Sequence, residues 1–202
     1  MIAKKTAAGV GDRTSQVYLI SKKNITSSKS FGKLVTDKKE LMSAVANYTT
    51  RACHKLRLQK SKAQGIYVYL RTNPFRRQDP QYNNGITYGF MEPSDDTTYM
   101  IQAARKSLEQ IYSKGYKYHK AGIMLLNLQP KALQQGLLFP PKQQSKRKQL
   151  LEAIEEIRSA YGPESAFLAA QGIQRKWEMK RNYRSPRYTT NWQEIPSTST
   201  KA

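Results

Sequence analysis

The side chains that most often do chemistry in enzymes are few in this chain, and they are scattered. Cys53 is the single cysteine and falls among the apolar positions of a predicted helix, which favours a buried, unreactive thiol over a nucleophile. His54 and His119 stand apart from other candidate groups, so each is interpreted as a surface residue or a nucleic-acid backbone contact. One thiol excludes an internal disulfide and a cysteine-based metal site.

The nearest approach to a metal site is a carboxylate cluster of Glu92, Asp95 and Asp96. Asp95 and Asp96 follow Pro93 and Ser94 at a predicted helix start, where carboxylates accept hydrogen bonds from free backbone N–H groups. Capping therefore accounts for these residues without a metal ion. We expect no catalytic residue, no metal and no cofactor, and hence no enzymatic activity.

Charge is the strongest compositional signal. The 202 residues include 35 Lys and Arg against 14 Asp and Glu, a net charge of +21. Such an excess repels itself unless a polyanion neutralises it, and nucleic acid is the first candidate. The longest apolar run, Ile123–Leu126, is far too short to span a membrane, and the basic start of the chain does not resemble a signal peptide. We therefore expect a cytoplasmic protein with no membrane partner.

Three predicted elements open the ordered part of the chain, after a basic flexible arm over residues 1–23. A strand ends near Gly32, and Thr36 is expected to cap the following helix, with Asp37 in its first turn. Apolar residues recur along that helix at spacings of three and four: Leu41, Val45, Tyr48, Ala52 and Leu56. The strand from Gly65 to Thr72 alternates, with Ile66, Val68 and Leu70 on one face and Tyr67, Tyr69 and Arg71 on the other.

The remaining elements complete a β-α-β-β-α-β order. A strand is predicted at Ile86–Met91, and a helix with apolar positions Ile101, Ala104, Leu108 and Ile111 is expected to end at Gly115 in a left-handed conformation. The last strand is predicted over Tyr116–Leu128, with a bulge at Gly122. This order predicts an α+β fold in which an antiparallel-rich sheet carries two helices on one face. The other face is left open, with Lys, Arg and Tyr side chains that suit a nucleic-acid backbone.

A proline-containing linker and a small helical domain are predicted to follow. Residues 129–145 lack hydrophobic periodicity and form the linker, residues 146–195 form the small domain, and residues 196–202 form a polar tail. A helix over Lys146–Tyr161 is expected to bury Leu150, Ile154, Ile157 and Tyr161 along one face, and Gly162 follows it. Trp177 is expected in a miniature core over that helix.

Several motifs in the same order resemble the C-terminal part of Y-family translesion DNA polymerases of the UmuC type. They cover about Asn24 to Pro196: Ser28-Lys29-Ser30-Phe31-Gly32-Lys33, Arg71-Thr72-Asn73-Pro74-Phe75, Tyr118-His119-Lys120-Ala121-Gly122, Trp177-Glu178-Met179-Lys180-Arg181 and Ser185-Pro186-Arg187-Tyr188-Thr189-Thr190. The resemblance implies a little-finger domain over residues 24–128 and a C-terminal extension. It includes no palm, the region that holds the catalytic Mg²⁺ ions in this family, so we expect no polymerisation by this chain.

The resemblance also implies site residues. Phosphate contacts of the little finger fall on Lys29, Ser30, Lys33, Arg71 and Thr72, and strand position adds Lys117 and Lys120. The alternative is a solvated basic surface. Gln135, Leu137, Leu138 and Phe139 of the linker resemble the peptide by which bacterial polymerases bind the sliding clamp, although such residues also pack on their own domain. Arg184 and Arg187 are equally consistent with DNA contacts and with internal packing.

Two functions follow from this resemblance. In the first, the chain is a non-catalytic module that grips primer–template or single-stranded DNA regardless of sequence and docks on the sliding clamp. In the second, it is a regulatory protein that competes with an intact translesion polymerase for the clamp, a UmuD-type subunit or the RecA filament. A competitor, unlike an accessory module, is expected to depress damage-induced mutagenesis in cells that carry the intact polymerase.

Overall fold

The computed structural model describes residues 23–131, 144–162, 165–173, 175–179 and 185–196. The elements in chain order are β1 (Ile25–Val35), α1 (Lys38–Leu58), β2 (Ser61–Thr72), β3 (Asn83–Ser94), α2 (Thr97–Ile111), β4 (Tyr118–Pro130) and α3 (Gln144–Tyr161), followed by the short 3-10 turns η2 (Ala169–Gln171) and η3 (Trp192–Glu194). The predicted β-α-β-β-α-β order is confirmed. No helix among these residues is long and apolar enough to cross a bilayer.

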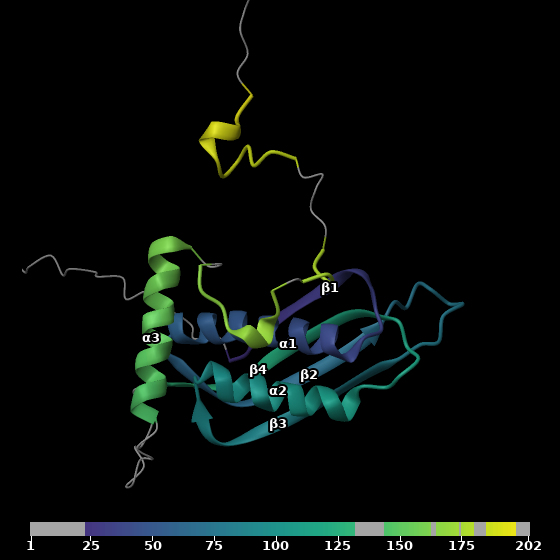
Figure 1. Ribbon diagram of the computed structural model, residues 1–202, viewed down its shortest axis with the longest axis horizontal. Helices are drawn as coiled ribbons and strands as arrows, with labels where there is room; N and C mark the ends of the chain where they lie inside the picture. Colours follow the sequence, from purple (N-terminus) through teal and green to yellow (C-terminus); the bar gives the residue numbers. More distant parts are fainter. Residues whose placement is uncertain (1–22, 132–143, 163–164, 174, 180–184, 197–202) are drawn as a thin grey trace, which may run out of the picture.

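The four strands form one antiparallel sheet in the order β1-β4-β2-β3. Helices α1 and α2 lie side by side on the same face of this sheet, as Figure 1 shows. The predicted α+β architecture is therefore correct, and every strand pairing is antiparallel. Because β4 lies between β1 and β2, residues about 50 and 90 positions apart in the sequence meet on the uncovered face of the sheet.

The core lies between the sheet and the two helices. Ile66, Val68 and Leu70 of β2 are fully buried, as their alternation predicts. The apolar positions of the helices face them and are also buried: Leu41, Val45, Tyr48, Ala52 and Leu56 of α1, and Ile101, Ala104, Leu108 and Ile111 of α2. Burial of this apolar area is the main force that holds the helices on the sheet. It also leaves Tyr67, Tyr69 and Arg71 on the opposite face.

The helix ends differ from prediction by a few residues. Asp37, rather than Thr36, is the N-cap of α1, and its carboxylate accepts a hydrogen bond from the Lys39 N–H at 3.1 Å. Asp96 caps α2 in the same way. Helix α2 ends at Ile111, and Gly115, with φ of +100°, lies in the turn that follows instead of ending the helix. Such a positive φ favours glycine because it has no Cβ.

The irregularity of β4 lies at His119, and the predicted bulge at Gly122 is wrong. Arg71 pairs with Lys120 and Thr72 pairs with Tyr118, so His119 is the extra residue on β4. Gly122 pairs regularly with Tyr69. A Cβ at this glycine would lie 2.5 Å from the Tyr69 hydroxyl, so the need for glycine comes from the ring that covers it. The strand also begins at Tyr118, two residues later than predicted.

The structure does not support the buried face predicted for the third helix. Leu150, Ile157 and Tyr161 of α3 are 58%, 43% and 81% exposed. Gly162 does follow the helix, with φ of +96°, and its N–H donates to the Arg158 carbonyl. The predicted linker begins inside the sheet, because β4 extends to Pro130. Most of the predicted arm, residues 1–22, lies outside the described residues.

Candidate nucleic-acid interface

The uncovered face of the sheet carries a row of polar and cationic residues across three strands. Ser30 of β1 pairs with Lys120 of β4, and Lys120 pairs with Arg71 of β2. Directly paired residues on one face have side chains within reach of each other. Arg71 is exposed and Lys120 is partly exposed. These three predicted site residues therefore form one continuous row, which we call the cationic row.

Two tyrosines cover the sheet beside the cationic row. The Tyr67 and Tyr69 rings stack with their centroids 5.9 Å apart and their planes 26° apart. Tyr69 lies over Gly122, and Tyr67 lies over Gly85, where an added Cβ would be 2.2 Å from the Tyr67 hydroxyl. The hydroxyl ends of both rings thus lie over the backbone of neighbouring strands. The open face is aromatic at this point.

Two of the predicted DNA contacts do not lie on this face. Lys29 pairs with Ala121, a buried residue of the helix-covered side, so the alternation of β1 directs it away from the cationic row. Thr72 is only 3% exposed. Its hydroxyl donates to Gln81 at 2.9 Å and accepts from the Tyr82 N–H at 2.9 Å, which closes the loop between β2 and β3. Thr72 therefore stabilises the loop that follows β2 and is too buried to contact DNA.

Two other predicted lysines form ion pairs at the surface. The Lys33 ammonium lies 3.2 Å from Glu40, and the Lys117 ammonium lies 3.2 Å from Asp79 in the loop between β2 and β3. Asp79 also lies 3.7 Å from Arg76. Exposed pairs of this kind contribute about 0–1 kcal/mol, so a phosphate can replace the carboxylate at little cost. Lys33 and Lys117 are secondary candidates beside the cationic row.

Two of the three carboxylates in the cluster of Glu92, Asp95 and Asp96 are engaged in other contacts. Asp95 pairs with Lys131 at 2.5 Å, and Asp96 accepts two backbone N–H bonds as the cap of α2. No group of three or more potential metal ligands occurs within the described part of the chain. Cys53 is fully buried, and burial raises the pKa of its thiol to about 12. The predicted burial of Cys53 is confirmed.

Helix α3 is joined to the helix layer by a charged cluster that sequence reasoning missed. The Glu155 carboxylate of α3 accepts from Arg57 and lies 2.6 Å from Nδ1 of His54, both on α1. Arg57 also donates to the Thr97 hydroxyl at 2.7 Å, which connects α1, α2 and α3. Partial burial opposes the charged form of Glu155, but the hydrogen bond and charge of Arg57, aided by His54, outweigh it and lower the pKa. Glu155 lies 101 positions from His54 and 98 from Arg57 in the sequence, so local spacing could not indicate the cluster.

Replacing Glu155 with glutamine is expected to weaken the attachment of α3 in a pH-dependent way. A lowered folded-state pKa means that the carboxylate stabilises the fold above its ordinary value of 4.5, and that this contribution is lost as pH falls through the lowered pKa. Urea unfolding of wild type and Glu155→Gln should therefore differ at neutral pH and converge in acid. A difference that stays constant across this range would contradict the role of the charged carboxylate.

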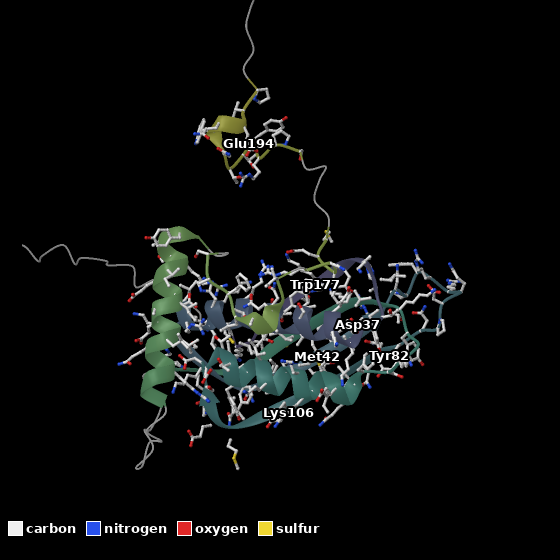
Figure 2. All side chains as sticks on the ribbon, in the orientation of Figure 1. Asp37, Met42, Tyr82, Lys106, Trp177 and Glu194 are labelled. Carbon is white, nitrogen blue, oxygen red and sulfur yellow. The ribbon has the colours of Figure 1, made fainter. Side chains whose placement is uncertain are left out.

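The chain after α3 returns to the first helix. Trp177 is 2% exposed and lies between Phe31 of β1 and Tyr48 of α1, with centroid distances of 6.2 and 5.6 Å. Figure 2 shows it on the α1 side of the domain. Its carbonyl accepts from the Gly32 N–H at 3.1 Å, and its indole N–H lies 3.3 Å from the Ser43 hydroxyl. The core interpretation of Trp177 is confirmed, but its partners belong to the sheet domain and not to α3.

A second buried residue strengthens this return. Gln171 is 2% exposed. Its side-chain amide donates to the Thr50 hydroxyl at 2.7 Å, and its backbone carbonyl accepts from the Ser43 hydroxyl. The segment containing η2 and Trp177 thus packs on α1 along two turns of the helix. The second domain was predicted to begin at residue 146, but Gln171 and Trp177 of that domain are buried against the sheet domain.

The C-terminal segment, residues 185–196, is held by hydrogen bonds among its own residues. Arg187 donates through its guanidinium and its backbone N–H to Glu194, and Asn191 donates to the same carboxylate. These hydrogen bonds, led by the Arg187 N–H, lower the pKa of Glu194 to about 2. Arg187 is exposed and makes these bonds within its own segment, so its role in DNA binding stays a prediction. Arg184 and the predicted clamp-binding residues Gln135, Leu137, Leu138 and Phe139 lie outside the described residues.

Comparison with known proteins defines the class to which this sheet domain belongs. The profile of the impB/mucB/samB family C-terminal domain matches residues 22–138, and a domain of unknown function (DUF4113) matches residues 148–197. The chain belongs to the impB/mucB/samB family, in the part that corresponds to its C-terminal domain. The predicted resemblance is confirmed.

Individual relatives agree over most of the chain. Protein UmuC of Salmonella typhimurium is 34% identical over 178 residues, protein SamB of the same species is 36% identical over 177, and protein MucB of Escherichia coli is 34% identical over 181. These matches cover 87%, 87% and 90% of this chain. The chain spans only 42–43% of the length of these relatives.

Solved structures show a more distant likeness. DinB from Sulfolobus solfataricus is 14% identical with a TM-score of 0.42, over 52% of this chain and 28% of that chain. The little finger domain of PolIV, solved in complex with a beta-clamp processivity factor, is 14% identical with a TM-score of 0.40, over 58% of this chain and 99% of that chain. Likenesses at this level carry no functional weight here.

Proposed function

We propose that this chain is a DNA-binding module of a translesion polymerase, which holds the sugar–phosphate backbone of primer–template DNA against the open face of its sheet. The carrying observation is the cationic row. Ser30, Lys120 and Arg71 come from three separate strands and meet on a face that no described element covers. Contacts from such a row reach phosphates, so they position DNA without reading its sequence.

The charge of the whole chain supports the proposal. A net charge of +21 concentrates DNA around the protein, and the open face gives that attraction a surface on which to act. The helix layer serves as the rigid support, because α1 and α2 are buried against the other side of the sheet. Sequence-independent binding suits a protein that must accept damaged template.

We assign no catalysis to this chain. In the Y-family polymerases that this chain resembles, the palm holds the metals for phosphoryl transfer. The region matched here is the C-terminal domain. Docking on a sliding clamp through Gln135, Leu137, Leu138 and Phe139 is part of the proposal and rests on the sequence motif alone. Contacts with a UmuD-type subunit or the RecA filament stay predictions.

Fluorescence anisotropy of a labelled primer–template across a salt series tests the DNA grip. We expect binding that is indifferent to sequence and weakens steeply with salt. Arg71→Ala should reduce the slope of log affinity against log salt by about 0.9, the value for one lost phosphate contact. Lys106→Ala, an exposed lysine of α2 on the helix side (Figure 2), is the matched control and should leave affinity nearly unchanged. Equal losses in both variants would contradict a localised site.

A further inference from the structure

We propose that Tyr67 and Tyr69 form a stacking platform for unpaired nucleobases of single-stranded DNA, so that the open face binds the junction between duplex and single strand. This inference rests on the proposed function, because it places a second contact beside the phosphate-binding cationic row. It goes beyond that function by naming the part of the DNA that this half of the face receives.

The first argument is the orientation of the rings. Gly122 and Gly85 leave the neighbouring strands without side chains at the two points where the Tyr69 and Tyr67 rings lie. The hydroxyl ends of both rings therefore lie over the backbone of these strands, and both tyrosines are partly exposed. The two rings stack on each other, with centroids 5.9 Å apart and planes 26° apart, and together present an aromatic surface on the open face. Such a surface accepts the flat face of any base.

The second argument is the position of the platform relative to charge. Tyr67, Tyr69 and Arg71 are successive residues of one strand face, so each follows the last by roughly 7 Å. Lys120 pairs with Arg71 at the charged end. In the other direction, Tyr67 pairs with Met124 and Thr87, neither of which carries a charge. The face therefore changes from cationic to aromatic along its length.

This gradient favours a junction over a continuous duplex. A duplex presents phosphates along its whole length and hides the faces of its bases, so the uncharged half of the surface would gain little from it. A single strand leaving the duplex exposes base faces, and sheets that bind single strands stack them on aromatic residues. The cationic row then holds phosphates while the platform holds the first unpaired bases.

The rings also have a structural role, because they cover two glycines in the sheet. That role alone requires no ligand and is the competing explanation. The two are separable on the DNA side, since removing bases from the overhang changes stacking without altering the protein.

The test compares two labelled duplexes with short single-stranded overhangs, one of thymines and one of abasic sites. We expect wild type to bind the abasic overhang about tenfold more weakly at the same salt slope. Tyr67→Phe with Tyr69→Phe should keep this preference, whereas Tyr67→Leu with Tyr69→Leu should abolish it. Tyr161→Leu, at an exposed tyrosine of α3, should behave as wild type. Circular dichroism melting confirms that each variant is folded.

The outcomes separate this inference from the proposed function. Salt-dependent binding that Arg71→Ala weakens, with equal affinity for thymine and abasic overhangs in wild type, would overturn the platform and leave the phosphate grip intact. Absence of salt-dependent binding to either DNA would overturn both. A base preference that persists in the leucine pair would place the stacking elsewhere and also overturn the platform.

Discussion

Replacing Trp177 with alanine is expected to lower the free energy of unfolding by about 3–5 kcal/mol, the usual cost of removing a large buried aromatic side chain. The indole is 2% exposed and meets both the Phe31 and Tyr48 rings edge to face. Its removal leaves a cavity at the joint between β1, α1 and the returning chain. Since small domains are stable by about 5–15 kcal/mol, the loss is a large fraction of the total.

The chain contains a matched control for this experiment. Trp192 is the other tryptophan and is 89% exposed. Trp192→Ala should change stability by less than about 0.5 kcal/mol, as most surface substitutions do. Urea unfolding followed by circular dichroism measures both variants. If Trp177→Ala costs less than about 1 kcal/mol, the segment that carries it rests on the domain without being part of its core.

Reversing the charge of the cationic row is expected to reduce affinity for primer–template DNA by on the order of 100-fold at low salt, because like charges facing each other cost several kcal/mol. The variant is Arg71→Glu with Lys120→Glu, which face each other across β2 and β4. Two attractive contacts with phosphate become repulsive ones. Replacing two opposed cations with two opposed anions leaves their mutual repulsion in the sheet nearly unchanged, so the fold should tolerate the change.

The control is a second double reversal with the same change in net charge. Lys39→Glu with Lys106→Glu alters exposed lysines of α1 and α2 on the helix layer. A glutamate at position 39 is in the first turn of α1, where negative charge is favourable. Anisotropy at matched salt measures both. A control that loses as much affinity as the test variant would show that only net charge matters and would contradict a defined binding face.

Local patterns in the sequence predicted the sheet and helix layer well. The alternation around Val68 identified both faces of β2, and the spacing from Leu41 to Leu56 identified the buried side of α1. Burial of one face of a strand or helix places apolar residues at every second position or at every third and fourth, so these patterns can be recognised in the sequence. Arg71 and Lys120 were both predicted as site residues. Their direct pairing was not, since it depends on the register between β2 and β4.

The predictions that failed concern features that depend on contacts between different segments of the chain. The extra residue at His119 shifts the pairing of β4, and no local signal distinguishes it from Gly122. Thr72 was predicted as a phosphate contact, but its hydroxyl is buried in hydrogen bonds with Gln81 and Tyr82 of the following loop. Trp177 was correctly expected in a core, but the choice between α3 and α1 depends on how the chain returns, which periodicity does not encode.

Alkylation of single cysteines with and without DNA tests the binding face most directly. Cys53 is fully buried with its pKa raised to about 12, so the native thiol contributes little background. Thr87→Cys places a thiol on the open face, where Thr87 pairs with Tyr67. Thr98→Cys places a thiol at an exposed position of α2. The account predicts that saturating primer–template DNA slows maleimide reaction at position 87 and leaves position 98 unchanged. Protection at position 98 with full reactivity at position 87 would contradict it.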